Sequence, residues 1–194
     1  STTFYPSQKV MCSPHLYTTK CNVSCFVCSE VFPIFVIGGD DGKIRIRSLT
    51  EGKKINTVDL GLEIPTKIII TDCWGFILIK TVKKLFLLSM NGRIIKVIND
   101  FVDFSQWFAF HTYDDFDFVV MKDDRNKIVY FEAMFPEKIY EFIDFSASIN
   151  VIKYDPYQSC FLLLTTDSRL FCFPCDVRPV NDDVVDNSNN NDSV

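Results

Sequence analysis

The residues best suited to chemistry in this chain are cysteines close to a histidine near the N-terminus. The candidate zinc ligands are His15, Cys21, Cys25 and Cys28. Zinc sites usually place paired cysteines on tight loops. Cys25 and Cys28 instead stand three apart in one apolar, strand-like run, so they point to opposite faces. We therefore expect core packing rather than metal binding. The same interpretation applies to Cys172 and Cys175.

Paired carboxylates are the second candidate for chemistry, because two neighbouring acids can perform acid–base catalysis or bind calcium. The pairs are Asp40-Asp41, Asp114-Asp115 and Asp123-Asp124. They mostly fall at predicted turns, where Asp accepts hydrogen bonds from its own backbone and tolerates unusual dihedral angles. We predict that these residues serve the turns.

The sequence contains few other groups that could carry out catalysis. It has two histidines, His15 and His111, and no serine or cysteine nucleophile in a recognisable elbow. The segment IGGDDG (37–42) is not followed by Gly-Lys-Ser/Thr, so it is not a phosphate-binding loop. We predict no catalytic, cofactor-binding or metal-binding residues, no cofactor, and a protein that is not an enzyme.

Positively charged residues provide the candidates for binding a partner. The predicted partner-binding residues are Arg47, Lys83, Lys84 and Arg125. Lys83 and Lys84 fall in one predicted hairpin turn and Arg125 in another, although ordinary solvated turns are the alternative interpretation. The formal net charge is −5, which lacks the cationic footprint that nucleic-acid binding requires. We therefore expect no nucleic-acid partner.

The predicted partner-binding residues lie within a repeated pattern of the sequence. Four segments each contain an apolar run, a turn and a second apolar run. The first runs start at Ile34, Phe76, Phe118 and Phe161, at intervals of 42, 42 and 43 residues. The second runs start at Ile44, Leu85, Ile128 and Leu170, at intervals of 41, 43 and 42 residues. Two independent anchors thus agree on one period, which is the strongest signal in the sequence.

Each period holds more than one hairpin. An apolar segment precedes every pair of runs, and a further strand-like segment follows the first three pairs, at 54–59, 93–98 and 138–143. Four short strands in each period predict an all-β, WD-repeat-like β-propeller of about four four-stranded antiparallel blades. The runs 85–88, 128–131 and 161–164 are continuously apolar, which predicts burial on both faces of each blade.

The blade count leaves two arrangements open. Residues 22–178 hold blades with limits near 22–61, 62–101, 102–144 and 145–178, and the last lacks a clear fourth strand after Phe173. In a closed four-blade ring, Gln8–Cys12 supplies that strand. In a partial propeller, residues 1–21 are a leader or a strand of a neighbouring blade. We favour the partial propeller, because common seven-bladed rings need roughly 300 residues at this period. Residues 179–194 are predicted to be a disordered acidic tail.

Propeller geometry also predicts which loops meet. Loops between second and third strands emerge beside the loops that join successive blades. The turns 40–42, 82–84, 123–126 and 166–168 should therefore share a face with the connections 62–65 and 100–103. That face is the candidate docking surface.

The third strand of the first blade is unusual, because Ile44 and Ile46 alternate with Lys43, Arg45 and Arg47. Two interpretations stay open. One side of this blade is wet or meets a polar neighbour, as expected at the end of an arc, or Arg45 is simply an exposed edge residue.

Four phrases of the sequence resemble a known family. They are VFPIFVIGGDDGKIRIRSL (31–49), NTVDLG (56–61), WGFILI (74–79) and YFEAMFPE (130–137). Together they resemble, in divergent form, the C-terminal WD-repeat propeller of large BEACH-domain proteins (Beige and neurobeachin-like) over about residues 22–175. The expected Trp-Asp is Arg47-Ser48 here and the Gly-His dipeptide is absent, so the tetrad that ties strand to loop is not supported.

The resemblance implies a scaffold module that follows a BEACH domain in a longer chain and takes part in vesicle and membrane trafficking. It implies protein partners and no catalytic residues. The chain begins without Met, as expected of a piece of a longer protein. No apolar run is long enough to span a bilayer and no signal peptide is visible. We therefore expect a cytoplasmic protein, peripheral on endomembranes.

Two alternative functions remain open. One is a propeller enzyme with a site in the central channel, where the starts of the innermost strands are polar. The other is a peripheral membrane or phosphoinositide binder that uses Lys83, Lys84, Arg93 and Lys96.

Overall fold

The computed structural model describes residues 20–111, 116–123, 125–143, 148–155 and 157–174. The described residues form fifteen strands and no helix. The first sheet contains β1 (Val23–Cys28), β2 (Ile34–Gly39), β3 (Lys43–Ser48) and β4 (Lys54–Asp59). The second contains β5 (Lys67–Ile70), β6 (Ile77–Lys80), β7 (Lys84–Leu88) and β8 (Ile94–Asn99). The third contains β9 (Phe104–His111), β10 (Asp117–Asp123), β11 (Ile128–Glu132) and β12 (Tyr140–Ile143). The fourth contains β13 (Ile149–Asp155), β14 (Cys160–Thr165) and β15 (Leu170–Pro174).

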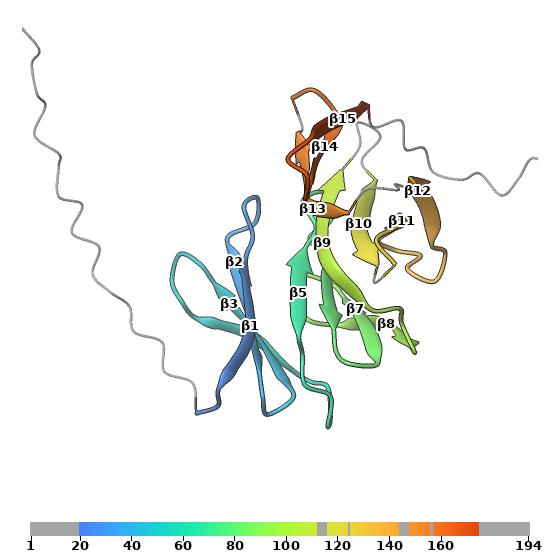
Figure 1. Cartoon of the computed structure of the whole chain (residues 1–194). Coiled ribbons are helices and arrows are strands. Elements are labelled where there is room, and N and C mark those ends of the chain that lie inside the picture. The colour runs from blue at the N-terminus through green and yellow to red at the C-terminus, as the bar shows by residue number, and fades with distance from the viewer. Residues whose placement is uncertain (1–19, 112–115, 124, 144–147, 156, 175–194) are drawn as a thin grey trace, which may run out of the picture.

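Every sheet follows the order of the chain, and neighbouring strands are antiparallel. Figure 1 shows the sheets fanned one after another, with the blue first sheet at one end and the orange fourth sheet at the other. The innermost strands contact one another in sequence, β1 with β5, β5 with β9 and β9 with β13. The fold is therefore a partial β-propeller, as predicted from the repeat.

Three buried clusters join the sheets in pairs. The first packs the first sheet on the second, the next packs the second on the third, and the last packs the third on the fourth. In the described part of the chain, no buried cluster joins the fourth sheet to the first. Among the described residues the arc is open there, which agrees with the arrangement favoured from sequence. Gln8–Cys12, the closing strand of the alternative four-blade ring, and the tail 179–194 lie outside the described residues.

Two-sided burial is clear in the middle sheets. In β6, Ile77 and Ile79 pack toward the first sheet, whereas Leu78 packs toward the third. Because successive side chains of a strand point to opposite faces, a strand between two sheets must be apolar at every position. The prediction holds for 85–88 and 128–131.

The fourth sheet departs from this expectation. Phe161 and Leu163 of β14 pack against the third sheet, but Leu162 and Leu164 stay partly exposed. No further described sheet covers that face, so the run 161–164 is buried fully on one side only.

The first sheet is the other end of the arc. Ile44 and Ile46 are fully buried against the second sheet. On the opposite face, Arg45 lies beside Ile37 and Arg47 beside Phe35. Arg45 also pairs with Asp41, with an Nη1 to Oδ1 distance of 3.0 Å. Arg45 lies on an inner strand of its sheet and its side chain is 17% exposed, so it is not an exposed edge residue. No described sheet covers this face, which agrees with a position at the end of the arc.

The cysteine predictions are partly wrong. Cys25 packs against the first cluster and Cys160 is buried, but Cys28 and Cys172 are exposed. Cys28 ends an innermost strand, and Cys172 lies on β15, which has no outer neighbour in the described sheet. Edge positions of this kind cannot be distinguished from core positions by apolar runs alone. Cys175 and His15 lie outside the described residues.

Candidate functional site

The first candidate site is the rim that carries the connections between sheets. We define this connection rim as the turns between β2 and β3, β6 and β7, β10 and β11, and β14 and β15, with the connections 60–66, 100–103 and Ser148. Hydrogen bonds join each turn to its neighbouring connection. They run from Leu60 N to Gly42 O (2.9 Å), Phe101 N to Lys83 O (3.1 Å), Ile149 N to Asn126 Oδ1 (3.0 Å) and Thr166 N to Ser148 O (2.9 Å). The predicted gathering of these loops on one face is therefore confirmed.

Local sequence explains why the turns are sharp. Gly42 has a φ of 70°, in the left-handed region that L side chains rarely adopt. A Cβ atom there would lie 2.3 Å from the carbonyl oxygen of Gly61. Asp40 accepts two hydrogen bonds from Asn22, and Asp123 accepts one from the Lys127 N–H. The Asp123 contact agrees with turn chemistry, as does Asp41, which accepts from the Lys43 N–H at 3.3 Å. The Asp40 bonds instead join the turn to the residue that precedes β1. Asp114, Asp115 and Asp124 lie outside the described residues.

The predicted partner-binding residues do not all meet. Lys83 is exposed and Lys84 half-buried on the connection rim of the second sheet, and Arg125 is exposed on the same rim of the third. Arg47 lies near the other end of its strand, where its Nη1 donates to the Gly52 carbonyl at 3.0 Å. The set is thus divided between two rims.

The alternative set for lipid binding is divided as well. Lys84 pairs with Asn99 at one end of the second sheet, whereas Arg93 adjoins the turn that precedes β8 at the other end. Lys96 donates to both carboxyl oxygens of Glu137 at 2.9 and 3.0 Å. These cations do not form one patch.

The connection rim also carries apolar side chains that the sequence analysis missed. Leu62 is fully exposed and Val82 is 75% exposed, with Ile64 and Val102 nearly half exposed. Lys84 pairs with Glu63 at 3.2 Å, and Phe101 bonds to Lys83, so these loops are adjacent. The available signal was an apolar residue inside a predicted polar turn. We call Leu62, Ile64, Val82, Val102, Lys83 and Lys84 the rim patch.

Polar groups beneath the rim patch form hydrogen bonds with the backbone of its loops. Lys80 is almost completely buried, and its ammonium donates to the carbonyls of Thr81 and Val82 at 2.8 and 3.1 Å. Burial lowers the pKa of Lys80. Hydrogen bonding from Thr81, and then from Lys84, lowers the pKa of Glu63. Backbone contacts of this kind hold the turn that presents Val82 and Lys83 in one conformation.

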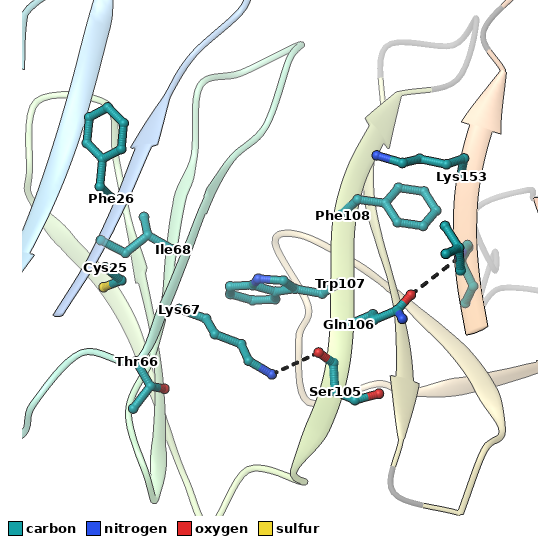
Figure 2. Close-up of a pocket in the computed structure, with 12 residues that line it drawn as sticks. Cys25, Phe26, Thr66, Lys67, Ile68, Ser105, Gln106, Trp107, Phe108 and Lys153 are labelled. Atoms are coloured by element: carbon teal, nitrogen blue, oxygen red, sulfur yellow. Dashed lines mark hydrogen bonds between the residues drawn. The ribbon is translucent and has the colours of Figure 1, made fainter. Parts of the chain in front are cut away.

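The second candidate site is a cavity of about 560 Å³ at the centre of the arc, at the end nearest the connection rim. All four innermost strands contribute to it (Figure 2). Its polar lining includes Thr66, Lys67, Ser105, Gln106 and Lys153. Its aromatic lining consists of Phe26, Trp107 and Phe108. The polar strand starts noted in the sequence at 66–67 and 105–106 therefore do converge on the channel.

Side chains in this cavity bridge neighbouring sheets. Lys67 donates to the carbonyls of Phe104 and Ser105, and its ammonium lies 4.4 Å from the centre of the Phe104 ring. Gln106 donates to the Asn150 carbonyl at 2.5 Å and accepts from the Ile152 N–H at 3.3 Å. Its amide thereby occupies the place that a peptide group of a paired strand would take between β9 and β13.

The described residues do not assemble a recognisable reactive centre in this channel. Burial raises the pKa of the Cys25 thiol, which disfavours the reactive thiolate. Across the described residues, no group of three or more His, Cys, Asp or Glu side chains is placed to hold a metal ion. None of the described segments forms a helix that is long and apolar enough to cross a membrane.

Comparison with known proteins supports the fold. No family model matches the chain. No curated protein matches it in sequence. The solved structure of the computationally designed Ika4 protein is similar with a TM-score of 0.54 and 11% identity, covering 82% of this chain and 94% of Ika4. The β-propeller domain of Cps50 (Swd1) from Myceliophteria thermophila is similar with a TM-score of 0.54 and 11% identity, covering 80% of this chain and 55% of that chain.

The designed Ika8 protein is also similar, with a TM-score of 0.50 and 11% identity, covering 79% of this chain and 46% of that one. The chain thus spans about half the length of the Ika8 and Cps50 chains. At this identity the likeness shows the fold alone. The chain has the fold of a β-propeller in the form of a partial arc.

Proposed function

We propose that this chain is a non-catalytic module that docks other proteins through its connection rim. The observation that carries the proposal is the rim patch, in which four exposed apolar side chains stand beside Lys83 and Lys84 on loops held together by hydrogen bonds. Exposed apolar side chains that cluster beside polar groups are typical of protein interaction sites. Arg125 extends the same surface to the third sheet.

The experiment compares partner capture by the parent chain and by a triple variant, Leu62→Asp, Val82→Asp and Val102→Asp. We expect proteins that copurify with the parent to be lost with the triple variant. The matched control is Val31→Asp, which changes a valine of similar exposure in the turn between β1 and β2, on the opposite rim. Equal loss with both variants, or no loss with the triple variant, would contradict docking at the rim patch.

We further propose that the module belongs to a BEACH-type trafficking protein. This part rests on the resemblance of the four phrases quoted above, and the partners would include the rest of a longer chain with its BEACH domain. It predicts a cytoplasmic protein that is peripheral on endomembranes. Fluorescence imaging of the tagged chain with endosomal and lysosomal markers tests it. A diffuse signal that ignores those compartments would argue against the trafficking role and leave rim docking intact.

A further inference from the structure

We propose that the cavity at the centre of the arc receives an acidic segment of a partner protein, with an aromatic or large apolar residue between its carboxylates. The inference rests on the proposed docking function and adds a second contact inside the channel. It depends on the charge of the cavity, on its aromatic walls and on the strand edges that border it.

The cavity is cationic although the chain as a whole is acidic. Of the described residues that line it, only Lys67 and Lys153 carry a charge, and none is a carboxylate. The chain has a formal net charge of −5. A cavity with one sign of charge and apolar walls concentrates the field and attracts groups of the opposite sign. The positive charge of Lys67 and of the exposed Lys153 therefore makes this cavity attractive to an incoming carboxylate.

Charge is also separated along the channel. A second cavity of about 250 Å³ lies at the other end of the innermost strands, and the charged residues that line it are Glu30 and Asp72. A segment that enters from the connection rim therefore meets positive charge first and negative charge beyond it. This order favours an acidic segment at the larger cavity and disfavours its passage through the channel.

The aromatic walls favour an apolar residue in the same segment. Phe26 is 59% exposed, and Trp107 and Phe108 are half-buried. Figure 2 shows the Trp107 ring pointing from β9 toward the strands of the first two sheets, with Lys67 beside it. Aromatic faces of this kind bind apolar and aromatic side chains.

The strand edges supply hydrogen-bonding groups. Strands β1, β5, β9 and β13 each stand at the end of their sheet, so alternate backbone groups on their free edges face the channel. Gln106 and Lys67 already bond to such groups of β13 and β9. An extended partner segment can use the same type of contact along the other edges.

The test uses the full chain carrying Trp74→Phe, which leaves Trp107 as the single tryptophan reporter of two. The probe is the capped peptide Glu-Glu-Phe-Glu-Glu, and its neutral counterpart is Gln-Gln-Phe-Gln-Gln. We expect saturable quenching of Trp107 fluorescence by the acidic peptide, binding about tenfold weaker for the neutral peptide, and loss of the difference at high salt.

Substitutions then locate the binding. Lys153→Met, at an exposed position, should weaken acidic-peptide binding about threefold to fivefold, and Lys67→Met about tenfold. Lys54→Met, at an exposed position of β4 outside the cavity and the rim patch, is the matched control and should leave peptide binding unchanged. Because Lys67 bridges two sheets, Lys153→Met keeps the test decisive if Lys67→Met unfolds.

Several results would overturn the inference. They are equal binding of both peptides, unchanged binding in Lys153→Met, or no fluorescence change with either peptide at about 1 mM. If the rim variants lose their partner while the acidic peptide fails to enter the channel, docking at the rim stands and only this inference fails. Inorganic phosphate in a parallel titration shows whether charge alone suffices; equal binding of phosphate and the acidic peptide would refute the peptide class.

Discussion

At the scale of single residues, Asp117 accepts the hydrogen bonds that join the second sheet to the third. This side chain is 3% exposed. Its carboxyl oxygens accept from the Thr71 hydroxyl at 2.6 Å, the Cys73 N–H at 3.0 Å and the Trp74 N–H at 2.8 Å. One residue of the third sheet thereby provides the acceptor for three hydrogen-bond donors in the turn between β5 and β6 of the second sheet. The sequence offered no sign of it, because its partners lie more than forty positions away.

We expect Asp117→Ala to lower the free energy of unfolding by about 2 kcal/mol, because it removes the acceptor of one buried donor, the Thr71 hydroxyl, and of two partly buried N–H groups. Chemical denaturation monitored by fluorescence measures the loss. The control is Asp103→Ala, which removes one exposed acceptor, that of the Phe104 N–H, and should cost less than about 1 kcal/mol. Similar losses for both variants would contradict the role assigned to Asp117.

At the scale of elements, the strands followed closely from the sequence. The alternation in β3 and the continuous apolar run of β7 were visible in neighbouring residues, because side-chain direction alternates along any strand. The exposed cysteines of β1 and β15 were not predictable in the same way. Whether a strand edge is covered depends on another sheet, and that sheet is distant in sequence.

The hairpin of β2 and β3 makes a prediction about pH. Hydrogen bonding from Arg45 lowers the pKa of Asp41 from 3.8 to about 2. A carboxyl group with a lowered folded-state pKa stabilises the fold above its unfolded pKa and loses that effect as pH falls through the folded value. The parent should therefore exceed Asp41→Asn in stability at pH 6 by about 0.5 kcal/mol, given the solvent exposure of the pair.

That difference should shrink as the pH is lowered from about 4 toward 2. Chemical denaturation of both proteins at pH 6, 4 and 3 provides the measurement. In an Arg45→Gln background the Asp41→Asn substitution should have little effect at any of these pH values. A difference that grows with acidification, or that persists in this background, would refute the ion pair as its cause.

At the scale of the whole molecule, the arc behaves as a row of sheets that each depend on their neighbours. The second and third sheets are covered on both faces, the first and fourth on one. In such an arrangement stability is approximately a sum of contributions from units and from the interfaces between them. The fourth sheet, with three described strands and one covered face, has the least support.

Hydrogen exchange followed by mass spectrometry tests this order. We expect the amides of β14 to exchange faster than those of β6, because end units open with a smaller free energy than units held on both sides. Peptides from β10 serve as an internal comparison and should resemble β6. Equal protection in all four sheets would show that the arc unfolds as one unit.

The candidate surfaces were only partly predictable from the sequence. Lys83, Lys84 and Arg125 were placed correctly on one rim, because turn positions follow from the strand pattern. Binding by these residues stays a prediction. The rim patch and the cationic cavity emerged only from the structure, since both depend on loops and strands that approach one another across sheets.

The sequence alone determined the repeat, the pattern of about four strands in each period and the alternation that buries their faces. These properties are encoded in residues a few positions apart, where steric and solvation effects act locally. Only the tertiary structure decided which sheet faces stay open, which lysines share a cavity and which carboxyl group ties two sheets together. Those outcomes depend on packing between segments about forty residues apart, and no local pattern specifies them.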